Sequence, residues 1–191
     1  MNTIKQWTEE ANRIAQEVKN TFGHLHAEQL NWKPEPEKWS VGQCIDHLIV
    51  TNTTYFPTLK SIADRRKETT FWEKVPYLPG FFGKALIKSF QPDAQSKLQS
   101  PKAFKPAMSI IPADIIDHFA NHQQELIELI KQTEGVDHQR VIITSPASKF
   151  VTYSLRDAFN IILVHERRHL EQAKGVIANE YFPNDTPLSN E

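Results

Sequence analysis

The chain has 191 residues, of which 39% are hydrophobic and 24% are charged, as is ordinary for one globular domain with a sizeable core. The net charge is −1, from 22 basic and 23 acidic residues, so the composition offers no basic surface for nucleic acid. A single cysteine excludes an intramolecular disulfide, and no stretch reaches the length of about 18 apolar residues that a membrane span needs. The first residues also lack a signal-peptide pattern. We therefore expect a cytoplasmic protein that binds neither nucleic acid nor membrane.

The first third of the chain predicts two helices. Apolar residues recur at steps of three and four, which indicates an amphipathic helix over residues 3–28. Two prolines that follow within eight residues cannot continue it. Ser40, with Gln43 three residues later, matches a capping box. We expect a second helix from this serine to about residue 67.

The middle of the chain has a different composition. Prolines and glycines punctuate residues 68–109, and aromatic residues are interleaved with them. So many aromatic side chains argue against a disordered linker. We interpret this segment as a packed crossover with a short helix at 81–90.

The last part of the chain predicts two more helices. One follows Pro112 and ends near Gly135. The β-branched run at 141–144 fits either a small strand or an extended loop. A further helix begins at Ser154, where a second capping-box pattern occurs, and ends at Asn179.

Together these elements predict an all-α fold, a four-helix bundle with a long crossover between its second and third helices. The short loop between the first two helices makes them antiparallel neighbours. The crossover is long enough for the second and third helices to run parallel. We expect a single domain over residues 1–183 and a polar tail over 184–191.

The run His165-Glu166-Arg167-Arg168-His169 carries the sharpest chemical signal. Two histidines four residues apart lie on one helical face, about 5–6 Å apart at Cβ, and could share one metal ion. They occupy a seam where the core would otherwise take Leu or Ile. The alternative is a pair of hydrogen-bonded core or boundary histidines.

The same run matches the H-E-x-x-H zinc-protease signature, in which Glu166 would be the general base. No further ligand pattern follows it, and no substrate-binding sheet is visible upstream. We interpret Glu166 as a surface residue or as a residue behind the ligands. Action as a base on a metal-bound water stays open.

Other candidate residues are less decisive. His118 and His122 are also four apart, and we interpret them as boundary residues, with His122 as an extra ligand or proton shuttle as the alternative. His47 lies roughly 110° from the centre of its helix's apolar stripe, on a polar edge that would suit a ligand or plain solvent. Cys44 falls on an apolar stripe and is typical of a core residue rather than a nucleophile.

Two segments resemble a known family. Residues 30–48, with Trp39-Ser40 at the helix entry and His47 seven residues past the serine, are similar to the second-helix motif of the DinB/YfiT-like superfamily. Residues 164–172, with His165 and His169, are similar to its fourth-helix motif. The resemblance covers most of the chain and is greatest to the branch called DinB-like domain 2.

This resemblance implies an up-down-down-up four-helix bundle with His47, His165 and His169 as metal ligands and water completing the shell. It implies nickel or zinc as the metal and a homodimer as the assembly. Characterised relatives include thiol-dependent S-transferases and mycothiol-dependent maleylpyruvate isomerases, and many members have no known activity.

These observations favour a divalent-metal-dependent enzyme that transfers a low-molecular-weight thiol to a small electrophile. The crossover aromatics and Tyr55 would line the electrophile pocket. The alternatives are a metal-dependent small-molecule hydrolase and a non-enzymatic, stress-associated bundle with a structural metal. An open coordination position would distinguish an enzyme from the structural role. The residues assign no catalytic group beyond the ligands and no thiol-binding residue.

Overall fold

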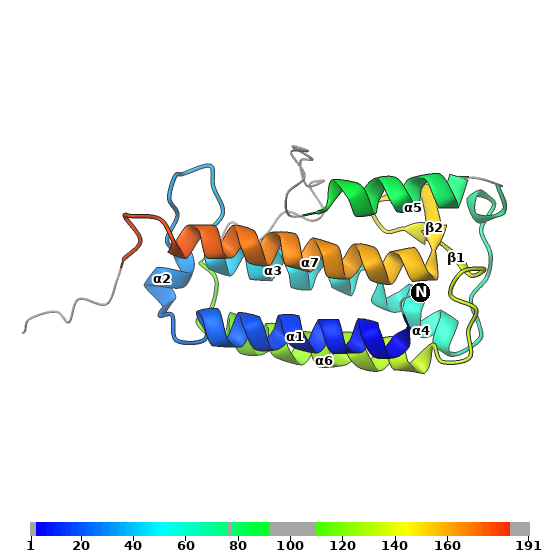
Figure 1. Ribbon diagram of the computed structural model, residues 1–191, viewed down its shortest axis with the longest axis horizontal. Helices are drawn as coiled ribbons and strands as arrows, with labels where there is room; N and C mark the ends of the chain where they lie inside the picture. Colours follow the sequence, from blue (N-terminus) through cyan, green and yellow to red (C-terminus); the bar gives the residue numbers. More distant parts are fainter. Residues whose placement is uncertain (1–2, 76–77, 92–109, 184–191) are drawn as a thin grey trace, which may run out of the picture.

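The computed structural model describes residues 3–75, 78–91 and 110–183, which are mostly helical (Figure 1). The helices in chain order are α1 (Ile4–Phe22), α2 (Ala27–Asn31), α3 (Val41–Thr53), α4 (Phe56–Ala63), the 3-10 helix η1 (Trp72–Lys74), α5 (Leu78–Ser89), α6 (Ile115–Gln132) and α7 (Leu155–Ile177). The strands β1 (Ile142–Ser145) and β2 (Ser148–Ser154) form an antiparallel hairpin between α6 and α7.

The long helices lie side by side along the long axis of the molecule (Figure 1). α1 packs on α6 and α7, and α3 packs on the same two helices from the other side. The predicted stripe of α1 faces this interior, where Ala11, Ile14, Val18 and Phe22 are fully buried. Burial of each larger apolar side chain contributes roughly 1.5–3 kcal/mol, so this stripe anchors α1 on its neighbours. No described helix is long and apolar enough to cross a bilayer.

The first predicted helix divides into two. α1 ends at Phe22, and Gly23 caps it through a hydrogen bond from its N–H to the carbonyl oxygen of Lys19 (2.9 Å). The chain then re-enters a helix, α2, after the extended residue His26. Glycine is a poor helix residue, so the interruption falls where the sequence least favours a helix.

The second predicted helix also divides, at Thr54 and Tyr55. The N–H of Tyr55 bonds to the carbonyl of Asn52 (2.9 Å), three residues back instead of four. Pro57 then stands in the first turn of α4, where the missing N–H of proline costs nothing. The break turns α4 away from the axis of α3 and sets Tyr55 at their junction.

The crossover contributes α5, which begins three residues before the predicted helix at 81–90. This helix packs on β2 and on α7. The close approach requires a glycine, because a Cβ at Gly83 would lie 2.6 Å from Oδ2 of Asp157 at the start of α7. Residues 92–109, the rest of the predicted crossover, and the predicted tail at 184–191 lie outside the described residues.

The chain is mostly helical, as expected, but the fold also contains a two-stranded sheet formed by β1 and β2. The run at 141–144 is a strand, and it pairs with β2 in the register Ile143 opposite Tyr153, with an irregularity after Thr144. Tyr153 is fully buried. The hairpin leads directly into α7, whose N-cap is Ser154 as predicted; its hydroxyl accepts a hydrogen bond from the N–H of Asp157 (3.1 Å).

Candidate metal centre

Two helix starts place the histidines. Ser40 caps α3: its hydroxyl accepts from the N–H of Gln43 (3.1 Å), and the Gln43 side chain accepts from the N–H of Ser40 (3.3 Å). This reciprocal box fixes the first turn of α3, and His47 follows two turns later on the side that faces α7. Residues four apart on α7 share a face, so His165 and His169 approach His47 together.

The three rings converge through their Nε2 atoms. His165 Nε2 lies 3.2 Å from His47 Nε2 and 3.1 Å from His169 Nε2, and one nitrogen of each ring lies within 4.8 Å of the others. Zinc–nitrogen bonds of about 2.0–2.1 Å in a tetrahedral shell place ligand nitrogens about 3.3 Å apart. All three side chains are buried, with exposures of 1%, 8% and 7% for His47, His165 and His169. Three buried histidines are thus able to hold one metal ion.

Neighbouring side chains fix the ring orientations. The Nδ1 of His169 lies 2.9 Å from Oε1 of Gln172, so the amide oxygen accepts the Nδ1 proton and leaves the Nε2 lone pair facing the cluster. The His47 Nδ1 lies 3.4 Å from the hydroxyl of Thr51. Trp39 stacks on the His169 ring, with the centroids 5.5 Å apart. Contacts on the outer side of His47 and His169 therefore orient these two rings, as is usual for ligand imidazoles.

The protonation of the rings suits a cation. Burial lowers the pKa of His169 to about 3. Burial also lowers the pKa of His165 well below its ordinary value, and the charges of the adjacent rings and of Arg168 add to this effect. Both imidazoles are therefore neutral near pH 7 and keep a lone pair for a ligand bond.

The cluster opens into a pocket of about 590 Å³. The three histidines line it together with apolar residues, namely Leu86 of α5, Phe90 directly after α5, and Ile161 and Ile162 of α7. The turn of the hairpin supplies Pro146 and Ala147 to the same wall. This volume suits a small organic molecule.

A pair of phenols closes another part of the pocket. Tyr55 and Tyr153 both line it, and their hydroxyl oxygens lie 2.8 Å apart. Burial raises the pKa of both hydroxyls, that of Tyr55 by far the more, so both keep their protons near neutral pH. Tyr55 was expected in the pocket, whereas Tyr153 was not named from the sequence, because nothing in the short β-branched run indicated the strand that carries it.

The family is decided by comparison with known proteins. Residues 10–173 match the family model of the DinB superfamily. The chain belongs to this superfamily. It is also 26% identical over 166 residues to the uncharacterized protein YuaE of Bacillus subtilis (strain 168). The aligned region covers 86% of this chain and 93% of the relative. No solved structure matches it.

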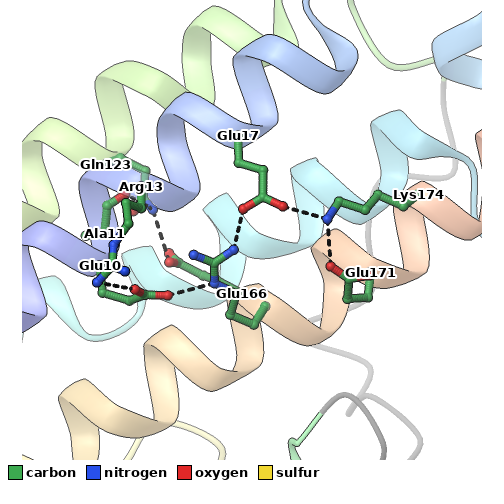
Figure 2. Close-up of polar contacts among 9 residues, drawn as sticks. Glu10, Ala11, Arg13, Glu17, Gln123, Glu166, Glu171 and Lys174 are labelled. Carbon is green, nitrogen blue, oxygen red and sulfur yellow. Dashed lines mark hydrogen bonds and ion pairs between the residues drawn. The ribbon is translucent and has the colours of Figure 1, made fainter.

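In this DinB-superfamily chain, Glu166 lies behind the histidines and inside the core. It is fully buried, and its carboxyl oxygens accept hydrogen bonds from Asn52 Nδ2 (2.7 Å) and Gln123 Nε2 (3.0 Å). Figure 2 shows it beside Gln123, on the side of α7 that faces α1 and α6. Burial raises its pKa to about 8 against the lowering effect of these two bonds. Of the two interpretations of Glu166, the surface position is wrong, because the side chain is buried. It also does not line the pocket as a zinc-protease base would.

The next residue, Arg167, ties α7 to α1. Its Nε donates to Glu10 (2.7 Å), and its Nη1 donates to Glu17. Glu17 also accepts from Lys174 (2.5 Å), which contacts Glu171 (2.7 Å) in the chain of ion pairs shown in Figure 2. These partly exposed contacts join α7 to α1.

The second histidine pair lies apart from the cluster. His118 is exposed and lies 3.2 Å from Asp114 Oδ2. His122 is buried, stacks on Phe56 with the ring centroids 4.8 Å apart, and does not line the pocket. The group of candidate ligands among the described residues contains His47, His165 and His169 and leaves His122 out.

Cys44 lies on the buried stripe of α3 and is fully enclosed. Burial raises the pKa of its thiol to about 12, so the thiolate is absent near neutral pH. A cysteine in this state is a core residue, because nucleophilic attack requires the thiolate.

Proposed function

We propose that this protein is a divalent-metal-dependent enzyme that transfers a low-molecular-weight thiol to a small electrophile. His47, His165 and His169 would hold the ion, with nickel or zinc as the metal. One observation carries the proposal: three convergent, buried histidines stand at the wall of a pocket large enough for a small organic molecule.

The donor set fits a metal ion better than it fits a hydrogen-bonded cluster. His165 Nε2 contacts both other rings, and it carries at most one hydrogen for two contacts. The Gln172 contact leaves the Nε2 of His169 without a hydrogen of its own. A shared cation accepts a lone pair from all three nitrogens and removes this deficit.

The chemistry needs a thiolate and an electrophilic carbon. A divalent ion held by the three imidazoles favours the ionised form of a thiol near neutral pH. The thiol gives up its proton to solvent, its sulfur forms a bond to the electrophilic carbon, and the leaving group departs with its bonding pair. The chain itself binds both molecules, excludes water and presents hydrogen-bond donors.

The electrophile would lie between the apolar wall and the two phenols. Leu86 and Phe90 offer apolar contact, while the protonated hydroxyls of Tyr55 and Tyr153 are able to donate a hydrogen bond to an oxygen of the electrophile. A donor positioned in a dry site stabilises negative charge that develops on such an oxygen.

The same site supports metal-dependent hydrolysis less well than thiol transfer. Glu37 is the carboxylate found in the pocket lining among the described residues, and Glu166 faces the core. A thiol substrate supplies its own nucleophile and needs no base at the cluster. The pocket also argues against a purely structural metal, which is normally enclosed by four protein ligands.

The proposed architecture is an up-down-down-up four-helix bundle formed by α1, α3, α6 and α7. Its support is the contact of α1 and α3 with the same two helices, α6 and α7. The single domain over residues 1–183, the homodimer and the cytoplasmic location belong to the proposal and rest on composition and on the family resemblance.

Metal content of the purified protein, measured by plasma mass spectrometry, tests the ligand set. We expect about one ion per chain, lost in His47→Ala and His169→Ala because two imidazoles rarely retain a catalytic ion. His118→Ala is the matched control, since it removes an exposed histidine. Metal that survives both ligand substitutions would overturn the ligand set.

Thiol binding tests the reaction class. Cobalt(II) replaces the native ion, and a thiol that reaches it produces a sulfur-to-cobalt charge-transfer band. We expect this band with small thiols and expect turnover with an activated electrophile such as 1-chloro-2,4-dinitrobenzene. A cobalt spectrum that no thiol changes would refute thiol transfer, and ester hydrolysis without thiol would favour the hydrolase.

A further inference from the structure

A guanidinium lies on the pocket wall beside the histidines. Arg168 stands on α7 between His165 and His169, and its side chain lines the pocket. Its Nη1 donates a hydrogen bond to the carbonyl oxygen of Ser89 (2.9 Å), the last residue of α5. This contact joins α7 to α5 and holds the planar group against the cavity.

The charge of the pocket favours an anionic ligand. Among the described residues, two basic side chains, Arg168 and Lys38, line the pocket against one acidic side chain, Glu37. A divalent ion at the histidines would add two more positive charges. A cavity of one sign with apolar walls concentrates ligands of the opposite sign.

Arg168 belongs to the metal end of the pocket. Its positive charge contributes to the lowered pKa of His165 and of His169, so the guanidinium lies within electrostatic reach of both rings. A molecule whose sulfur reaches the histidines therefore presents its nearest substituent to Arg168. The electrophile, by contrast, has the apolar wall and the tyrosine pair on its side.

We propose that Arg168 binds a carboxylate of the low-molecular-weight thiol, so that the thiol substrate is an acidic one. This inference rests on the proposed function. A guanidinium binds a carboxylate through two parallel N–H···O bonds, which fix orientation as well as affinity. The carboxylate and the thiolate together also offset the positive charge of the pocket and its ion.

A pair of matched thiols tests this inference on the cobalt(II)-loaded protein. The probes are 3-mercaptopropionate and its neutral amide, 3-mercaptopropionamide, each titrated while the sulfur-to-cobalt band is followed. We expect wild type to bind the acid at least about tenfold more tightly than the amide. We expect Arg168→Gln to bring the ratio close to one.

Lys88→Gln is the charge-matched control. Lys88 is an exposed cation on α5, one residue before Ser89, and it does not line the pocket. Its loss should leave the ratio of the two dissociation constants unchanged. Comparing ratios between variants also cancels the different intrinsic acidities of the two thiols.

Three outcomes would overturn the inference: equal binding of both thiols by wild type, an unchanged ratio in Arg168→Gln, or an equal loss in Lys88→Gln. An equal loss in Lys88→Gln would assign the preference for the acid to the overall positive electrostatic field of the protein. Arg168→Lys keeps the positive charge but lacks the planar pair of N–H donors of a guanidinium. It should therefore lose most of the preference for the acid over the amide. Equal binding of both thiols by wild type overturns the inference even where a variant does not fold. A cobalt band that neither thiol produces would instead refute the proposed function.

Discussion

Replacement of His122 by phenylalanine should make the protein more resistant to acid. The His122 side chain is 8% exposed and stacks on Phe56 with an interplanar angle of 12°. Its Nε2 has no hydrogen-bond partner within the described part of the chain. Burial lowers its pKa to about 4, against a small opposing effect of Glu125.

The size of the effect follows from proton linkage. In the unfolded chain His122 takes up a proton as pH falls below about 6.5, whereas in the folded protein it stays neutral until about pH 4. The folded state therefore loses stability between these two values, because the unfolded state binds more protons. Between pH 7.5 and pH 4.5 the expected loss from this residue is about 2.5 kcal/mol.

Urea unfolding of the metal-free protein at both pH values measures this loss. His122→Phe keeps the aromatic stack and removes the titrating ring, so the difference between variant and wild type isolates His122 from every other group. We expect that difference to grow by about 2.5 kcal/mol in favour of the variant on going from pH 7.5 to pH 4.5. Metal content should match that of wild type, because His122 lies outside the cluster.

A difference that is the same at both pH values, within about 0.5 kcal/mol, would refute the reasoning. It would mean that His122 binds its proton equally well in the folded and unfolded states. Loss of metal in the variant would show instead that His122 acts as a ligand.

Three other substitutions have expected outcomes. Ser40→Ala removes the cap of α3 and should lower the free energy of unfolding by about 1 kcal/mol in chemical denaturation, with metal content retained. Glu166→Gln should stabilise the metal-free protein increasingly from pH 4.5 to pH 8, by about 4 kcal/mol at the upper end, because the folded protein holds a proton that the unfolded chain loses. A loss of stability that grows with pH would show an ionised Glu166. Tyr55→Phe breaks the hydroxyl contact with Tyr153 and should cost about 1 kcal/mol in thermal unfolding, while kcat falls with the cobalt band unchanged; an unchanged kcat would exclude the proposed hydrogen bond to the electrophile.

The ligand residues differ in how far the sequence could reveal them. His165 and His169 follow from their spacing of four on a predicted helix. His47 lies off the apolar stripe of α3, where periodicity is equally compatible with solvent, and only the family resemblance selected it. In the structure that polar edge faces α7 and the pocket, with His47 1% exposed. Apolar periodicity identifies the buried face of a helix, but it does not indicate whether a polar edge faces a cavity or solvent.

The helix breaks had local signals that periodicity concealed. Gly23 lowers helix propensity, and Pro57 cannot donate to the preceding turn, yet the apolar stripe continues through both places. The burial of Glu166 had no such signal. A carboxylate in the core depends on Asn52 and Gln123, which come from two other helices and are distant in sequence.

The pocket combines two parts of the fold with different tolerance to change. The histidines come from α3 and α7, two long helices whose other faces are committed to the core. Leu86 lies in α5, Phe90 directly follows this helix, and Ala147 lies in the hairpin turn; α5 and the hairpin pack on the outside of α7. Mutational libraries confined to these three wall positions should therefore alter which electrophiles are accepted while the ion is retained. Substrate preference could therefore change during evolution through α5 and the hairpin, while the histidine cluster on α3 and α7 stays unchanged.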